Sequence, residues 1–171
     1  MNARERELRA VLETHGGMLR RIVASYERDP SLQNDLLQEV SLALWTALPR
    51  FSGAGSKRAF VARIAQNRAI THSVRRSKEP RGEDVEVRDD SPSIEDRLDT
   101  ERRAARMFDC VRELPVDQRR LVVLALEGFS AREIAAELQI TENNASVRLH
   151  RARARLKKRM SRWQTTTTGT T

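Results

Sequence analysis

The sequence of 171 residues contains few cysteine, histidine and aromatic residues. Its single cysteine, Cys110, excludes an internal disulfide and a metal cage built from paired cysteines. Three scattered histidines, His15, His72 and His150, supply no cluster of metal ligands. With only four Phe, one Tyr and two Trp, the core is expected to be aliphatic and thin, as in small helical bundles. We therefore expect helices, and no metal or other cofactor.

A long apolar run is also missing. The N-terminal residues MNARERELRA are charged where a signal peptide needs an apolar segment. No stretch of the chain approaches the roughly 18 consecutive apolar residues of a membrane-spanning helix. These two absences predict a soluble, cytoplasmic protein.

Charged residues are abundant and lie in separate blocks. The net charge is +8, with 14 Lys/Arg against 7 Asp/Glu in residues 1–78, 3 against 10 in residues 79–101, and 15 against 7 in residues 102–171. Two basic blocks favour a polyanionic partner such as nucleic acid. The alternative reading is solvated helix faces joined by an acidic linker.

Residues 1–78 have apolar side chains at steps of three and four, which predicts three helices. Gly16-Gly17 is expected to break or bend the first helix. Asp29-Pro30-Ser31 predicts a turn and cap before the second helix, which ends near Pro49. Ser56 is the predicted cap of the third helix.

The third helix is expected to have a cationic surface. Val74 is predicted in its core face, and His72 at the surface or only partly packed. The side chains predicted to be exposed are Lys57, Arg58, Arg63, Arg68, Arg75 and Arg76.

The rest of the chain predicts a linker, a second helical domain and a tail. Residues 79–98 form an acidic segment. Its first part combines acidic residues with Pro, Gly and Ser and shows no core pattern, as in flexible linkers. Residues 99–163 again show helical spacing, with a helix ended by Pro115 and a glycine cap at Gly128. Residues 164–171 are expected to be a disordered tail. The predicted fold class is all-α, with two small helical domains joined by a flexible acidic linker.

The strongest local signal is a helix-turn-helix in the C-terminal domain. Ser130 and Glu133 form a capping box that opens a short helix. Gln139-Ile140-Thr141 makes a turn, and Thr141 caps a long final helix. At about 100° per residue, one face of this final helix is core: Ala145, Leu149, Ala152, Leu156 and Met160.

The opposite face of the final helix carries residue types that bind bases in a major groove. These residues are Asn143, Asn144, Ser146, Val147, His150 and Arg151. Arg148 and the cations that follow, Arg153, Arg155, Lys157, Lys158 and Arg159, suit phosphates. A basic surface helix without DNA is the alternative, but the capped helix and short turn favour DNA binding. No histidine or cysteine has a catalytic partner at useful spacing, so we do not expect an enzyme.

Four ordered motifs resemble the extracytoplasmic-function (ECF) sigma factors, the smallest class of bacterial sigma subunit in the sigma-70 family. Asp35-Leu36-Leu37-Gln38-Glu39-Val40, followed by Leu44-Trp45, is similar to a segment of sigma region two. Arg63-Ile64-Ala65-Gln66-Asn67-Arg68-Ala69-Ile70 resembles another. Leu114-Pro115-Val116-Asp117-Gln118-Arg119 with Glu127-Gly128-Phe129-Ser130-Ala131-Arg132-Glu133-Ile134-Ala135, and then Arg148-Leu149-His150-Arg151-Ala152-Arg153, resemble region four.

The resemblance implies a transcription initiation factor that binds core RNA polymerase, through its clamp helices and flap, and promoter DNA. Residues 1–78 would be region 2, which melts the minus-10 element, and residues 99–163 region 4, which reads the minus-35 element through the helix-turn-helix. Asp35, Gln38 and Glu39 would contact the polymerase clamp. The residues implied at the minus-10 element are Ser52, Lys57, Arg58, Arg63, Asn67, Arg68, Arg75 and Arg76. An anti-sigma factor is a possible partner, and the free chain would be a monomer, nucleoid-associated during initiation.

The chain departs from the family at two places. Lys57 and Phe60 stand where the family usually has an aromatic residue and a tryptophan. Residues 143–148 differ from the usual recognition-helix run, which implies a distinct upstream promoter sequence. Two other functions stay open: a helix-turn-helix regulator that acts without polymerase, and a sigma-like decoy for an anti-sigma factor. Both cationic blocks are present, which argues against the decoy.

Overall fold

The computed structural model describes residues 2–78 and 95–167. Within these residues it is entirely helical and contains no strand. The elements are α1 (Ala3–Ala24), α2 (Pro30–Ala47), the 3-10 helix η1 (Leu48–Arg50), α3 (Lys57–Lys78), α4 (Glu95–Arg112), α5 (Val116–Leu126), α6 (Ala131–Leu138) and α7 (Glu142–Thr167). The all-α prediction is therefore confirmed for the part of the chain that is described.

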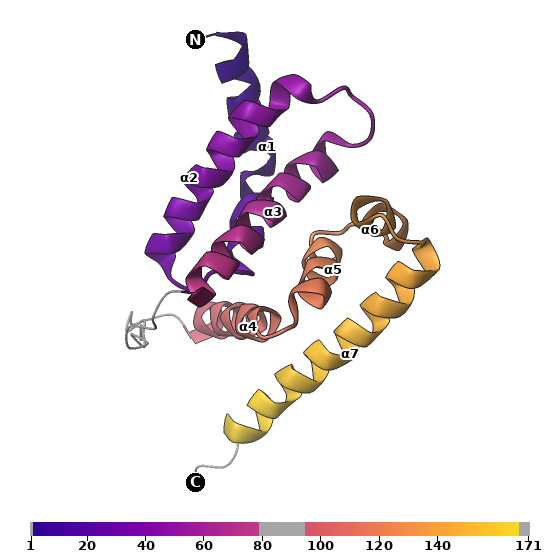
Figure 1. Ribbon diagram of the computed structural model, residues 1–171. Coiled ribbons are helices and arrows are strands. Elements are labelled where there is room, and N and C mark those ends of the chain that lie inside the picture. The colour runs from indigo at the N-terminus through magenta and orange to yellow at the C-terminus, as the bar shows by residue number, and fades with distance from the viewer. Residues whose placement is uncertain (1, 79–94, 168–171) are drawn as a thin grey trace.

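Helices α1, α2 and α3 form a three-helix bundle, which we call the N-terminal half (Figure 1). Its core is aliphatic, with Leu19, Ile22, Leu36, Leu44 and Val61 among the fully buried side chains. The aspartate predicted to cap α2 does so, because a carboxylate oxygen of Asp29 accepts a hydrogen bond of 2.8 Å from the amide of Ser31.

Helix α1 runs without interruption through Gly16-Gly17, so the predicted break is wrong. Each glycine costs a helix about 1 kcal/mol relative to alanine. The adjacent side chains of Met18 and Leu19 are buried in the bundle, and their burial outweighs that cost. Val74 is also not in the core: its side chain is 45% exposed, because it lies about 200° around α3 from the buried His72.

Helices α4 to α7 form the C-terminal half, in which α5 and α6 lie between α3 and α7 (Figure 1). Gly128 closes the end of α5 in the left-handed region, with φ of +84°, as predicted for a glycine cap. Cys110 is buried in this half.

Two predicted segment boundaries differ from the helix ends in the structure. Helix α4 begins at Glu95, so residues 95–98 of the predicted linker are helical. Helix α7 continues to Thr167, four residues into the predicted disordered tail. The rest of the linker, residues 79–94, and residues 168–171 lie outside the described part of the chain.

Candidate polymerase and promoter surfaces

The helix-turn-helix forms with the predicted caps. The Ser130 hydroxyl accepts from the Glu133 amide at 3.2 Å, and the Glu133 carboxylate accepts from the Ser130 amide at 2.7 Å. The hydrogen bond from the Ser130 amide to the carboxylate, and secondly the Ser130 side chain, lower the pKa of Glu133. The turn passes through Gln139, a non-glycine residue with φ of +55°. Thr141 then caps α7 by accepting from the Asn144 amide at 3.1 Å.

Helix α7 has the two faces predicted for a recognition helix. Ala145, Leu149, Ala152 and Leu156 are buried against the C-terminal half, and Met160 packs partly against it. Asn144 is half-buried. The other predicted base-reading and phosphate-binding residues at the start of the helix are exposed: Asn143, Ser146, Val147, Arg148, His150 and Arg151. A continuous polar and cationic face is therefore open to a DNA groove.

The predicted polymerase-binding residues lie along one face of α2. Asp35 and Gln38 are exposed. Glu39 is half-buried and accepts hydrogen bonds of 2.9 and 3.0 Å from Arg75 of α3. Leu42, one turn beyond Gln38, is 67% exposed and was not predicted. Its signal in the sequence is a leucine outside the apolar stripe that contains Leu36, Val40 and Leu44.

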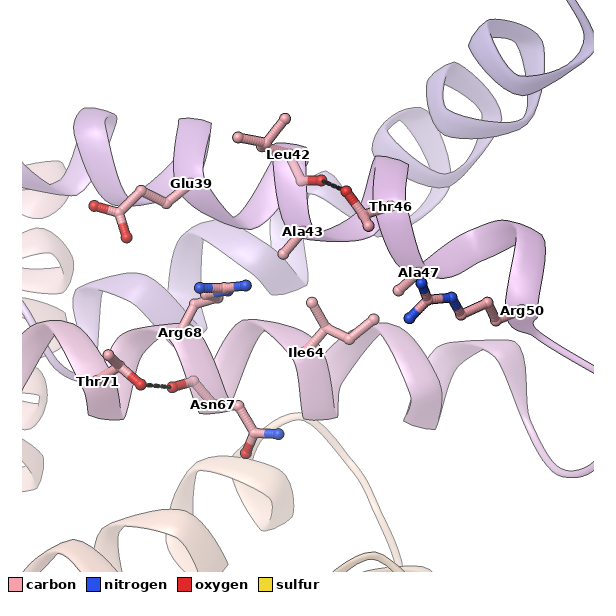
Figure 2. A pocket seen from close by; sticks show the side chains of 10 residues that line it. All are labelled: Glu39, Leu42, Ala43, Thr46, Ala47, Arg50, Ile64, Asn67, Arg68 and Thr71. Atoms are coloured by element: carbon pink, nitrogen blue, oxygen red, sulfur yellow. Dashed lines mark hydrogen bonds between the residues drawn. The ribbon is translucent and has the colours of Figure 1, made fainter.

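A groove between α2 and α3 adjoins this face (Figure 2). Figure 2 shows Ala43 and Ile64 pointing into it, with Arg68 towards one end and Arg50 at the other. Asn67 also lines it, but its side chain points away from α2. The groove thus joins predicted polymerase-binding and predicted minus-10 residues.

The predicted minus-10 residues are spread over α3 and the loop before it. Ser52, Lys57, Asn67 and Arg68 are exposed. Three cations form ion pairs within the N-terminal half: Lys57 with Glu7 at 3.0 Å, Arg75 with Glu39 at 2.9 Å, and Arg76 with Glu27 at 3.6 Å. The structure therefore does not gather all eight residues into one open patch.

Arg58 is not freely exposed, contrary to the prediction, because the C-terminal half covers it. Its guanidinium lies 4.2 Å from the centre of the Phe129 ring and donates a hydrogen bond to the carbonyl of Glu127. The Glu127 carboxylate accepts two hydrogen bonds of 2.8 Å from Arg21 of α1. We call Arg21, Arg58, Glu127 and Phe129 the Glu127 clasp. It ties α1 and α3 to the end of α5.

Further contacts extend this interface between the two halves. Gln66 donates to the carbonyl of Arg120 at 3.1 Å, and Arg63 lies 3.9 Å from the Glu137 carboxylate. Arg112 donates to the carbonyl of Ala24. The two cations predicted to bind DNA at this surface, Arg58 and Arg63, are thus engaged by the C-terminal half.

His72 is buried rather than at the surface, which corrects the prediction. Its Nε2 atom lies 2.7 Å from the carboxylate of Glu27, and both side chains are at least nine-tenths buried. Glu27 also accepts from the amide of Asp29 at 2.9 Å. The pair joins the end of α1 to α3 and has a structural role.

Among residues 2–78 and 95–167, no group of three or more His, Cys, Asp or Glu side chains could hold a metal ion. Burial raises the pKa of the Cys110 thiol, which disfavours the reactive thiolate. No helix in the described part of the chain is long and apolar enough to cross a membrane.

Comparison with known proteins places both halves in one family. Residues 11–79 match the model of sigma-70 region 2, and residues 104–156 match that of sigma-70 region 4. The ECF RNA polymerase sigma factor SigD of Mycobacterium tuberculosis is 34% identical over 163 residues, which cover 88% of this chain and 75% of SigD. The RNA polymerase sigma-H factor of Pseudomonas aeruginosa is 27% identical over 149 residues, or 80% and 77% of the two chains.

Two solved structures share the fold. The structure of CnrH in complex with the cytosolic domain of CnrY has a TM-score of 0.65 and 24% identity, covering 90% of this chain and 87% of that one. The sigma factor RpoE, in complex with the anti-sigma factor NepR from Bartonella quintana, has a TM-score of 0.65 and 21% identity, covering 92% and 96%. Sigma-70 regions 2 and 4 match in this order along the chain, and the helical fold agrees with that of the two solved structures. The chain therefore belongs to the ECF sigma factors of the sigma-70 family, non-enzymatic proteins that direct transcription initiation with RNA polymerase.

Proposed function

We propose that the exposed face of α2 docks this sigma factor on the clamp helices of core RNA polymerase. Asp35 and Gln38 offer an acidic and an amide group on successive turns, and the exposed Leu42 lies beside them. An apolar side chain next to polar groups that bind arginine is a common arrangement at protein interfaces. Glu39, bound to Arg75, adds a second carboxylate to this face.

The second contact in the proposal is between α7 and the minus-35 element. Residues at the start of α7 enter the major groove, since they are exposed and the first turns of a recognition helix reach deepest. Arg151 is the principal base-reading residue. The exposed polar and cationic face of α7, beside a formed helix-turn-helix, is the observation that supports this proposal most strongly.

The third contact is between α3, with the loop before it, and the melted minus-10 element. Ser52, Lys57, Asn67 and Arg68 are exposed in the described arrangement, whereas Arg58 is covered by the C-terminal half and the exposed Arg63 lies 3.9 Å from Glu137 of that half. Full use of the minus-10 surface therefore requires the two halves to separate. Polymerase docking supplies that separation, and the free chain, a monomer, binds promoter duplex weakly.

The interface between the halves is suited to opening because it is incompletely hydrogen-bonded. Three buried atoms there have no hydrogen-bond partner among the described residues: the Tyr26 hydroxyl and the Nε atoms of Arg119 and Arg120. Each such atom costs about 1–3 kcal/mol when buried. That cost offsets part of the stabilisation from the contacts across the interface.

In this proposal an anti-sigma factor regulates the chain. Both structural neighbours were solved with a second protein, and RpoE with an anti-sigma factor. A protein that binds both halves of this chain would keep Arg58 covered and Arg63 paired with Glu137. The site of action is the cytoplasm, on the nucleoid during initiation, because the template and the polymerase are there.

Runoff transcription tests the proposal. Core polymerase is combined with the chain, promoter DNA is selected from a random pool by the assembled holoenzyme, and the selected DNA is transcribed. A defined transcript that depends on the chain is expected. Tight, sequence-specific binding of duplex by the chain alone would support the regulator without polymerase, and an absence of any chain-dependent transcript would support the decoy.

A further inference from the structure

A second hollow lies at the end of the N-terminal bundle where α1 begins and α2 ends, next to the loop that leads to Lys57. Its lining residues come from the first turn of α1, the end of α2 and η1: Arg4, Trp45, Thr46, Pro49 and Arg50. We call it the arginine hollow. Thr46 and Arg50, which Figure 2 shows lining the groove between α2 and α3, also line this hollow, so the two depressions share a wall.

The cations along these two depressions are unpaired within the part of the chain that the structure describes, as are Arg9 and Arg20 on another side of α1, but only the former line a depression. Arg4, Arg50 and Arg68 have no ion pair or hydrogen bond with any residue that the structure describes, whereas Lys57, Arg63, Arg75 and Arg76 each pair with a carboxylate. The acidic residue lining either depression is Glu39, which is already bound by Arg75. A row of positive charge therefore lacks a protein counter-charge.

The position of Arg4 adds to this imbalance. It lies in the first turn of α1, where the helix dipole disfavours a cation. Trp45 lies beside Arg4 and Arg50 and is half-buried. Cations with an adjacent aromatic ring, in an open groove, are the combination that binds single-stranded nucleic acid without regard to sequence.

The hollow is continuous with the proposed minus-10 surface. Arg50 directly precedes Phe51, where the loop that leads to Lys57 and α3 begins. Because Thr46 and Arg50 line both depressions, a strand held by that loop would reach Trp45 and Arg4 past Arg50. An acidic peptide would satisfy the charges but would make no use of the ring.

We propose that the arginine hollow binds the melted promoter strand beyond the minus-10 element, with Arg4 and Arg50 on its phosphates and Trp45 against a base. This inference rests on the proposed function. Arg4, Trp45 and Arg50 would then lengthen the contact with promoter DNA without reading its base sequence.

The test uses holoenzyme assembled from core polymerase and the chain. Its affinity is measured for a single-stranded oligonucleotide with the selected minus-10 sequence, alone and lengthened by about four nucleotides at either end. The wild-type holoenzyme gains affinity from one extension. Arg4→Ala/Arg50→Ala loses most of that gain while keeping its affinity for the short oligonucleotide. Its salt slope on the long one falls by about 1.4, or about 0.7 per lost phosphate contact.

The matched control is Arg9→Ala/Arg20→Ala, which removes the same charge from exposed positions on another side of α1. It should behave as the wild type. If the double variant at Arg4 and Arg50 keeps the full gain, or if it loses affinity for core polymerase instead, the inference is overturned. If the wild-type holoenzyme does not bind even the short oligonucleotide, the proposed function itself fails.

Discussion

The Glu127 clasp gives a direct way to perturb the balance between closed and open arrangements. Glu127→Ala removes the two hydrogen bonds to Arg21 and leaves the Glu127 carbonyl available to Arg58. The Arg21 side chain is 57% exposed and the Glu127 side chain only 6%, so the arginine returns to water when its partner is lost. The variant therefore leaves no unpaired charge buried.

The expected size of the effect follows from that exposure. An exposed ion pair contributes about 0.2–1 kcal/mol, and this one belongs near the upper end because the carboxylate accepts two bonds. A loss of about 1 kcal/mol raises the ratio of open to closed molecules by a factor of about 5. The charge-swapped chain Arg21→Glu/Glu127→Arg should recover part of the pair.

Fluorescence energy transfer measures this ratio in the free chain. Dyes are attached at Asn34→Cys in α2 and Ala154→Cys in α7, both exposed, in a Cys110→Ser background. Glu127→Ala should increase the population with low transfer, with unchanged helical content by circular dichroism. The control Glu113→Ala breaks an ion pair with Arg159 inside the C-terminal half and should leave transfer unchanged. Equal transfer in Glu127→Ala and the wild type would refute the role of the clasp.

The remaining predictions concern single residues. Burial raises the pKa of Glu137, against the opposing charges of Arg63 and Arg120. The ionised form therefore destabilises the fold: this loss is absent below the ordinary pKa, grows as pH rises from that value to the raised one, and is constant above it. The stability of Glu137→Gln relative to the wild type should thus increase in urea unfolding as pH is raised from below the ordinary pKa, and a difference that does not change with pH would contradict this. Ser130→Ala should cost about 1 kcal/mol of unfolding free energy, and should raise the Glu133 pKa, followed by NMR, only in part, because the Ser130 amide still donates to the carboxylate. Arg151→Ala should weaken promoter binding by about 1–3 kcal/mol and relax base preference at one or two upstream positions. Lys157→Ala should weaken all sequences alike, with a salt slope smaller by about 0.9, and the opposite pattern in a transcribed promoter library would mean that the assumed helix register is wrong.

Local features of the fold were predictable because neighbouring residues determine them. Asp29, Ser130 and Thr141 cap the helices they were expected to cap, since a cap depends on the residue and the next turn. The buried face of α7 follows from its period of 3.6 residues. The same periodicity places Leu42 outside the apolar stripe of α2, but that position becomes informative only once the bundle fixes the inner face of the helix.

The features that were missed depend on residues far apart in the sequence. His72 is buried because Glu27, 45 positions earlier, meets it across the bundle. The local pattern predicts that Arg58 is exposed, but Glu127 and Phe129, about 70 positions later in the sequence, contact its guanidinium. Gly16-Gly17 stays helical because burial of the adjacent side chains outweighs a local preference.

The binding of core RNA polymerase to the α2 face tests the central claim most directly. The affinity of Asp35→Ala/Gln38→Ala/Glu39→Ala for core enzyme is compared with that of the wild type and of Arg75→Ala, which breaks the same ion pair but keeps the face. The triple variant should keep its circular dichroism spectrum and lose polymerase binding, whereas Arg75→Ala should bind as the wild type does. Undiminished binding by the folded triple variant would contradict the assignment of this face to the polymerase.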